Sequence, residues 1–359
     1  MSAPKAGGLL ENVIGWDVGG AHLKAAWHAH GRLQDVAQWA CPLWKGMDHL
    51  HAAVAAAQAR WPEAMAGHHA VTMTGEMTDG FADRAEGVAR IATALTTALP
   101  GPVRLFAPAG AQRAWVGADE AARAWTHIAS ANWLASAHHA GLVHGAGLLV
   151  DVGSTTTDLI RLRDGGADTT SQTDRDRLAS GELVYQGVVR TPLCALAQRV
   201  PLAGQALNVM NEWFATTADV YRLTGELDAA HDLHPAADGG GKDLPATRRR
   251  LAHMVGCDAA DASAAQWLAL AQHWRGAQAG LMATALRRVW RPGAPPARVV
   301  TAGCGAFLVP EVLRLAFGTR AAGIAVYPYA DATMASVCAP SVAVAALYLQ
   351  DQGRLPCGL

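Results

Sequence analysis

The chain has 359 residues, of which 51% are hydrophobic and 16% are charged, and this composition is typical of a compact globular protein long enough for two domains. Its net charge is -1 and its longest basic run is "RRR" at 248–250, so a nucleic-acid partner is not expected. The sequence predicts neither a signal peptide nor a membrane span, and its six cysteines form no CxxC pair, which together favour a cytoplasmic protein with reduced thiols.

The first half of the chain alternates strands and helices. "NVIGWDVGG" (12–20) predicts an apolar strand that ends in a glycine turn, and residues 23–40 predict a hairpin bent at Gly31. A helix is expected over 47–61. A strand that delivers a polar turn is expected over 69–81, and one long alanine-rich helix is expected over 118–141, ended by Gly141.

The second half begins with the same pattern. "GAGLLVDVGSTTTDLIRLRDG" (145–165) repeats the strand, the Asp-Val-Gly turn and the second strand, which predicts two related halves. Helices and loops are expected over 190–262, with a flexible or ligand-ordered loop at 234–245. A helix over 264–290, a strand with a glycine turn at 297–310 and a closing helix at 335–350 complete the chain.

Glycine turns at strand ends indicate a phosphate site. Glycine lets the backbone approach a ligand closely, and the turn then presents N–H groups to phosphate oxygens. Asp17 and Asp151 stand at the two strand ends, where a carboxylate can hold Mg²⁺. Two matched turns favour a functional role, although both aspartates could instead cap their own hairpins.

The order of these motifs resembles the actin, sugar-kinase and Hsp70 superfamily, with residues 14–25, 148–161 and 299–306 as its two phosphate motifs and its adenosine motif. The resemblance implies an α/β, two-domain actin-like (ribonuclease H-like) ATPase fold with an interdomain cleft. The expected domains are 1–145, 146–335 with a helical insertion, and a closing C-terminal helix within 336–359.

Further segments resemble the hydantoinase A/oxoprolinase branch, and within it the tetrahydromethanopterin-linked C1 transfer pathway proteins, whose archaeal relatives make methanofuran. These segments are "TGEMTDGF" (74–81), "IASANW" (128–133), "SGELVYQGVVRTPLCAL" (180–196), "FATTADVYRLTGEL" (214–227), "ADGGGKD" (237–243) and "MVGCD" (254–258).

This resemblance implies a transferase of methylofuran or methanofuran biosynthesis, in the one-carbon metabolism that oxidises formaldehyde. The enzyme would join an aminomethylfuran that carries a CH₂-diphosphate to the phenol of a glutamyltyramine or a tyrosine-type partner. An aryl ether forms and diphosphate leaves. Mg²⁺ is inferred from diphosphate chemistry, and ATP binding is left open. The partners are thus small molecules, and a homo-oligomer is one option for the assembly.

The implied site residues fall into three groups. The expected metal ligands are Asp17 and Asp151, and the candidate acids and bases are His22, Glu76, Asp79 and Glu182, with Asp219 as a rival base. The expected diphosphate-binding residues are Gly19, Gly20, His22, Lys24, Gly153, Ser154, Thr155, Thr156, Lys242, Gly303 and Gly305.

His22 is the main departure from the superfamily, which has threonine or serine at this place. Imidazole can donate to a phosphate oxygen or protonate a leaving diphosphate near neutral pH. It could also be a surface residue of the turn.

Other residues carry plain structural alternatives. Glu76 and Asp79 could simply stabilise a turn, and Cys304 is expected to be a small packed residue rather than a nucleophile. The segment "HDLHPAAD" (231–238) is expected to be a solvated loop rather than a metal site, and the histidine pairs at 68–69 and 138–139 to face solvent or helix ends.

Two other function classes remain open at this point. One is an ATP-dependent small-molecule kinase or a hydantoinase/oxoprolinase-type amidohydrolase, which the intact second phosphate motif favours. The other is a non-catalytic ATP-sensing scaffold, which would leave the polar turns at 74–80 and 237–243 without a role.

Overall fold

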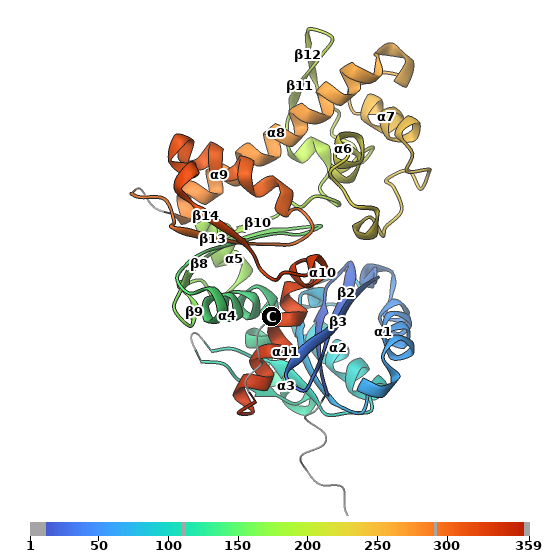
Figure 1. Cartoon of the computed structure of the whole chain (residues 1–359). Coiled ribbons are helices and arrows are strands. Elements are labelled where there is room, and N and C mark those ends of the chain that lie inside the picture. Colours follow the sequence, from blue (N-terminus) through green and yellow to red (C-terminus); the bar gives the residue numbers. More distant parts are fainter. Residues whose placement is uncertain (1–11, 110–111, 291–292, 355–359) are drawn as a thin grey trace, which may run out of the picture. The chain divides into compact units, whose positions relative to one another are not determined.

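The computed structural model describes residues 12–109, 112–290 and 293–354, so the N-terminal eleven residues and Cys357 lie outside the described part. The chain forms two compact units (Figure 1). Unit 1 comprises residues 1–147, 162–173 and 328–359, and unit 2 comprises residues 148–161 and 174–327. The domain limits expected at residues 145 and 335 stay predictions. The chain passes between the compact units at 147, 161, 173 and 327.

Unit 1 is built on a six-stranded sheet in the order β3-β2-β1-β4-β5-β6. The first three strands are antiparallel neighbours, whereas β4 and β5 continue in parallel with β1. This order and these directions are those of the ribonuclease H-like fold. The strands are β1 (Asn12–Val18), β2 (His22–Ala29), β3 (Arg32–Ala40), β4 (His68–Met73), β5 (Val103–Phe106) and β6 (Trp115–Val116).

Helices cover the sheet of unit 1. They are α1 (Asp48–Arg60), α2 (Arg84–Ala98), α3 (Ala118–Ile128), α4 (Asn132–His144), α10 (Thr333–Val337) and α11 (Ala339–Asp351). Ile14, Trp16 and Val18 of β1 belong to one core cluster with apolar side chains of α1 and α2. The intervening Gly15 is so close to α11 that a Cβ atom there would overlap the carbonyl oxygen of Ser341. The central strand is therefore packed on both faces, which explains its nearly unbroken apolar run.

Unit 2 repeats this plan around the path β10-β8-β7-β13-β14. Here β13 runs parallel to β7, as β4 does to β1. The strands are β7 (Gly147–Val152), β8 (Thr157–Arg163), β10 (Leu183–Val184), β13 (Arg298–Ala302) and β14 (Ala325–Pro328). The two residues of β9 (Gly166–Ala167) pair with the end of β8 inside unit 1. The predicted relation between the two halves is confirmed by this shared strand plan.

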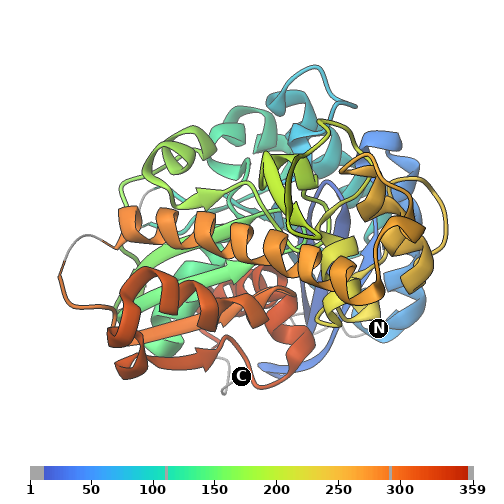
Figure 2. The ribbon, with the colours of Figure 1, turned by 90° about the horizontal axis from the view of Figure 1, so that it is seen from above.

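The remaining elements of unit 2 are mostly helices. They are α5 (Asp174–Ser180), α6 (Thr217–Thr224), α7 (Leu244–His253), α8 (Ala264–Val289) and α9 (Val309–Phe317), together with the hairpin β11 (Arg199–Leu202) and β12 (Gln205–Asn208). Figure 2 shows α8, in orange, along its whole length. Its start is fixed by Ser263, which forms a capping box with Gln266.

Three sequence expectations are wrong. The helix expected over 118–141 is two helices, because the chain breaks at Ser130, which adopts φ 52°. Gly141 does not end a helix. It lies inside α4, where a Cβ atom would come within 2.5 Å of the Gly166 nitrogen, and α4 ends at Gly145. The hairpin of β11 and β12 stands where only helices and loops were expected.

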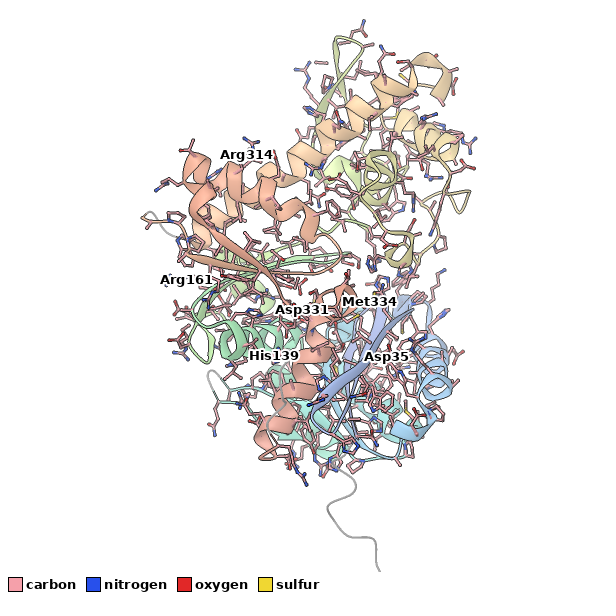
Figure 3. All side chains as sticks on the ribbon, in the orientation of Figure 1. Asp35, His139, Arg161, Arg314, Asp331 and Met334 are labelled. Carbon is pink, nitrogen blue, oxygen red and sulfur yellow. The ribbon has the colours of Figure 1, made fainter. Side chains whose placement is uncertain are left out.

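The histidine pairs at 68–69 and 138–139 are also placed differently from the expectation. His69, His138 and His139 are buried within unit 1. His139, labelled on α4 in Figure 3, lies 2.6 Å through its Nδ1 from the hydroxyl of Tyr329. These histidines face the core because the helices and strands that carry them are packed on both sides.

Among the helices of the described ranges, none is both long enough and apolar enough to cross a membrane.

Candidate functional site

The first glycine turn joins β1 to β2 in unit 1. The Gly19 N–H donates to the carbonyl oxygen of His22 at 2.9 Å, which closes the turn. A Cβ atom on Gly19 would lie 3.0 Å from that oxygen, and one on Gly20 would lie 3.0 Å from Thr78 Cγ2. Neither glycine has a positive φ. Glycine is therefore needed here for close approach rather than for an unusual backbone angle.

The second glycine turn, in unit 2, has the same geometry. The Gly153 N–H donates to the carbonyl oxygen of Thr156 at 2.8 Å. In both units, the valine just before the turn also accepts a backbone hydrogen bond from the loop that follows the neighbouring parallel strand. In unit 1 the Thr74 N–H donates to the Val18 carbonyl oxygen at 3.0 Å, and in unit 2 the Gly305 N–H donates to the Val152 carbonyl oxygen at 2.7 Å. His22 thus stands where unit 2 has Thr156. Its side chain is only 6% exposed, so the alternative of a surface turn residue is wrong.

The two aspartates occupy equivalent places at strand ends. Asp17 lies in β1 opposite Lys24, and Asp151 lies in β7 beside Ala302 of the next parallel strand. Gly303 lies directly against the second strand end: it adopts φ 81°, and a Cβ atom there would overlap the Val152 carbonyl oxygen and lie 2.5 Å from Asp151 Oδ1. The "AGCG" turn is therefore built onto the Asp-Val-Gly turn of its own unit. Cys304 packs partly buried against the core.

The polar turn at 74–80 is adjacent to the first glycine turn. A Cβ atom on Gly75 would lie 3.2 Å from the Gly19 carbonyl oxygen. Glu76 is buried, and its Oε1 accepts hydrogen bonds from Arg84 at 3.2 Å and from the Ser130 hydroxyl at 3.0 Å. Burial raises the pKa of the Glu76 carboxyl, although the Arg84 charge and these hydrogen bonds oppose the rise. Asp79, in contrast, is exposed.

Residues 187–191, which lie within the segment "SGELVYQGVVRTPLCAL" (180–196), support the second turn. Gly187 presses against the Ser154–Thr155 peptide, and its carbonyl oxygen accepts three side-chain hydrogen bonds, from Thr191, Thr217 and Gln278. The Ser154 carbonyl oxygen accepts from the backbone N–H groups of Val189 and Arg190 at 3.0 and 2.9 Å. The segment 187–191 therefore fixes the second turn from behind.

Arg190 is a cation that sequence reasoning missed at this turn. Its backbone is bonded to Ser154, and burial lowers the pKa of its guanidinium below the ordinary value. Its position within "GVVRT" was visible in the sequence, but only the fold brings this segment onto residues 153–156.

The two lysines assigned to diphosphate both contact protein groups. Lys24 Nζ donates to the Val337 carbonyl oxygen at 3.0 Å, at the end of α10. Lys242 Nζ forms an ion pair with Asp232 Oδ1 at 3.1 Å. Burial raises the pKa of Asp232, but the hydrogen bonds and charges of Arg222 and Lys242 outweigh it and hold this pKa below its usual value.

Asp219 and Glu182 are both buried in unit 2. Asp219 Oδ1 lies 2.8 Å from Nη1 of Arg222 and 2.8 Å from Nε of Arg250. Arg250 also donates to Asp238 and to the Gly241 carbonyl oxygen, so this network anchors the glycine-rich loop at 237–243. Glu182 follows Gly181 beside β8, and its carbonyl oxygen accepts from Leu159 at 2.8 Å.

Two sets of predicted residues are thus brought together, one in each unit. In unit 1 they are Asp17, Gly19, Gly20 and His22 beside the turn of Glu76 and Asp79. In unit 2 they are Asp151, Gly153, Ser154, Thr155 and Thr156 beside Gly303 and Gly305. Within the described ranges, no three His, Cys, Asp or Glu side chains cluster as a ready metal site. A cation at either turn would therefore depend on ligand oxygens as well as protein ones.

Residues 68–350 match the family model described as hydantoinase/oxoprolinase, which is well over half of the chain. The chain belongs to the hydantoinase/oxoprolinase family. The match begins at β4 and includes the second glycine turn, the "AGCG" turn and nearly all of α11.

Two proteins of methane-producing organisms named below are similar to the chain in sequence. One, from Methanocaldococcus jannaschii, is the (4-{4-[2-(gamma-L-glutamylamino)ethyl]phenoxymethyl}furan-2-yl)methanamine synthase. It is 30% identical over 247 residues, which cover 68% of this chain and 72% of that protein. A protein of the same name from Methanococcus vannielii is 45% identical over 73 residues, covering 20% of this chain and 32% of that protein.

Solved structures of other enzymes are also similar. Component A of the (R)-2-hydroxyglutaryl-CoA dehydratase of Acidaminococcus fermentans matches with a TM-score of 0.46 and 10% identity, covering 95% of this chain and 98% of that one. A ROK-family glucokinase from Streptomyces griseus matches with a TM-score of 0.44 and 14% identity, covering 94% and 98%.

Proposed function

We propose that this member of the hydantoinase/oxoprolinase family is a transferase that forms an aryl ether in the assembly of methanofuran or methylofuran. Its substrates would be an aminomethylfuran with a CH₂-diphosphate group and a phenol of the tyramine or tyrosine type. The similarity to the Methanocaldococcus jannaschii synthase, over about two thirds of both chains, carries this proposal, because that protein's name describes a phenoxymethyl-furan product. We place the reaction in the cytoplasm.

The proposed reaction exchanges one carbon–oxygen bond for another. The bond between the furfuryl carbon and diphosphate breaks, and its electron pair leaves with diphosphate. The phenolic oxygen forms the new bond to that carbon and loses its proton to a base. The furan ring delocalises positive charge at the carbon, so the protein mainly has to neutralise the leaving group and receive the proton.

His22 and the glycine turns are proposed to bind diphosphate. The loop backbones at residues 19–22 and 153–156 are held by the same hydrogen bond in each unit, and this preorganisation suits a polyanion. His22 replaces a hydroxyl residue with a group that can donate a proton to the departing oxygen.

Asp79 is the proposed base. Glu76 is closed off from solvent and holds Arg84 and Ser130, whereas Asp79 stands exposed on the same turn. An exposed carboxylate suffices as a base, because the phenolic oxygen becomes strongly acidic as its new bond forms. Glu76 would then position the turn that carries Asp79.

The donor set fits Mg²⁺ as a proposed cofactor. Asp17 ends the strand before the first turn, and Asp151 ends the strand before the second. At either turn Mg²⁺ would be held by that one carboxylate together with substrate phosphates. When bound, the ion would neutralise charge on the diphosphate. The fit can be tested without turnover: diphosphate should bind in a calorimeter when Mg²⁺ is present, and EDTA should abolish the signal.

The deciding experiment is a turnover assay with the synthetic furan diphosphate and γ-glutamyltyramine. Stoichiometric release of diphosphate together with the mass of the ether would support the proposal, with ATP having no effect. Release of phosphate from ATP, with no ether formed, would instead support an ATP-dependent kinase or amidohydrolase. That second function is favoured by the hydroxyl-rich turn at 154–156, which is held against Gly187.

Replacement of His22 tests its assigned role. We expect His22→Thr to lower kcat by about 100-fold, because general-acid assistance contributes on this order, while diphosphate affinity changes much less. His51→Thr is the matched control, since His51 is exposed on α1. Unchanged turnover in His22→Thr, or a gain of ATP hydrolysis, would show that the residue is a variant of an ordinary nucleotide turn.

A further inference from the structure

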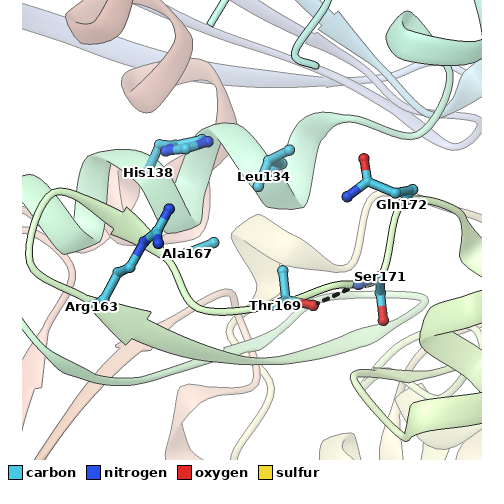
Figure 4. Close-up of a pocket in the computed structure, with 7 residues that line it drawn as sticks. All are labelled: Leu134, His138, Arg163, Ala167, Thr169, Ser171 and Gln172. Carbon is cyan, nitrogen blue, oxygen red and sulfur yellow. Dashed lines mark hydrogen bonds between the residues drawn. The ribbon is translucent and has the colours of Figure 1, made fainter. Parts of the chain in front are cut away.

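Unit 1 contains a surface pocket, lined by both polar and apolar side chains, that the proposed reaction does not use. It has a volume of about 110 Å³, several times the space that one bound water needs. It lies between α4 and the segment 163–172, which follows β8 (Figure 4). Leu134 and Ala167 supply apolar surface, and the polar lining includes His138, Arg163 and Gln172. None of these residues is among those assigned to diphosphate.

His138 is the most informative residue of the lining. It is only 3% exposed, and its Nε2 has no hydrogen-bond partner within the described chain. A buried polar atom without a partner is costly, so a ligand that pairs with it gains affinity. The other side of the ring contacts the loop after β8, where a Cβ atom on Gly166 would lie 2.7 Å from Nδ1.

The protonation state of His138 decides what Nε2 can do. Burial lowers the pKa of His138, and the charges of Arg113 and Arg163 lower it further, against the opposing effects of Asp351 and a backbone hydrogen bond with Gly165. The ring is therefore neutral near pH 7. The hydrogen bond with the Gly165 backbone raises this pKa, so an imidazole N–H donates it; since Nε2 has no partner, we assign that N–H to Nδ1, which leaves Nε2 as an acceptor that requires a donor from the ligand.

Arg163 has the opposite hydrogen-bonding character, because its guanidinium donates and needs an acceptor on the ligand. Its side chain makes no ion pair with any residue of the described part and extends toward the His138 imidazole in Figure 4. Gln172 lies across the space from it. A guanidinium suits a carboxylate, whereas Nε2 suits a hydroxyl.

We propose that this pocket binds a short hydroxycarboxylate, with its carboxylate on Arg163, its hydroxyl donating to His138 Nε2, and its carbon atoms against Leu134 and Ala167. Both sides of the cavity belong to unit 1, but the segment 162–173 reaches this unit only after the chain has passed through residues 148–161 of unit 2. A bound ligand would hold this returning segment on α4 and raise the thermal stability of unit 1.

The proposal is tested by titrating the full-length protein with lactate, propionate and inorganic phosphate in a calorimeter. Lactate should bind with one-to-one stoichiometry and about tenfold more tightly than propionate, because only lactate pairs with His138 Nε2. Arg163→Gln should weaken lactate binding by at least about tenfold, as expected for the loss of a charged hydrogen-bond donor. Arg123→Gln, which removes an exposed cation from α3, should leave it unchanged.

A second readout reports on the histidine itself. The side-chain ¹⁵N signals of His138 should shift when lactate is added and should not shift in Arg163→Gln. Equal affinity for lactate and propionate would overturn the hydroxyl assignment, and binding of phosphate alone would overturn the carboxylate assignment. The absence of any binding at millimolar concentrations would overturn the site, as would lactate binding that Arg163→Gln leaves unchanged.

Discussion

Acidification from pH 6.5 to about 4 is expected to unfold unit 1. Burial lowers the pKa of His28 from 6.5 to about 4, that of His69 to about 4 and that of His139 to about 3. In this pH range the unfolded chain therefore binds more protons than the folded one, so stability falls as the pH falls. Each histidine costs about 3 kcal/mol by the end of the range, and three such costs approach the whole stability of a typical domain. Circular dichroism over this pH range would measure the transition.

His28 offers a sharp variant for this test. Neither of its ring nitrogens has a hydrogen-bond partner within the described chain, so His28→Leu removes an acid-sensitive group without breaking a bond. We expect the variant to be more stable at pH 7 and to unfold at a lower pH. His273→Leu, at an exposed position of α8, is the matched control and should keep the wild-type midpoint. If both variants unfold at the wild-type pH, His28 is not the cause of the acid transition.

Replacing Gly303 by alanine is expected to destabilise unit 2 by more than about 3 kcal/mol, which is the range of severe single substitutions. The residue adopts φ 81°, and the added Cβ atom would overlap the Val152 carbonyl oxygen, which already accepts a hydrogen bond from Gly305. Because these atoms belong to the backbone of the second turn, the chain cannot relieve the overlap by turning a side chain. Urea unfolding followed by tryptophan fluorescence would measure the loss.

Gly204 provides the control for Gly303. It has the same φ of 81°, but no atom lies within 4 Å of the position of an added Cβ. Only the backbone conformation therefore disfavours Gly204→Ala, and we expect the free energy of unfolding to fall by about 1 kcal/mol. Equal losses in the two variants would mean that φ alone, and not the close packing on Val152, explains the need for glycine at 303.

The Asp-Val-Gly repeat predicted the two related halves, because each copy ends an apolar strand and begins a tight turn, and such local patterns survive in the fold. Gly31, at φ 75°, bends the predicted hairpin for the same local reason. The helix break at Ser130 was not predictable in this way. The alanines on both sides of it, Ala129 and Ala131, suit a helix, and its positive φ accompanies a hydrogen bond from its hydroxyl to Glu76, 54 positions away.

The sequence was enough to predict the glycine turns of the candidate site, but not the residues that pack behind those turns. Sequence identified the glycines and aspartates of both turns, but gave no reason to connect Gly187 with Ser154 or Gln278 with the Gly187 carbonyl oxygen. These contacts join positions far apart in the chain and depend on tertiary packing. The buried histidines were misplaced for a related reason, since a histidine between apolar residues says nothing about which neighbours will close over it.

The discontinuity of unit 1 has a consequence for how the protein is made. Its strands β1 to β6 lie within residues 12–116, but α11 (Ala339–Asp351), which packs against Gly15, is synthesised only after all of them. All residues of unit 2 emerge before that helix does. Unit 2 can thus fold during synthesis, whereas the sheet of unit 1, although made earlier, keeps one apolar face uncovered until α11 has been made. This N-terminal sheet, rather than the newest part of the nascent chain, is where we expect chaperones to bind during translation.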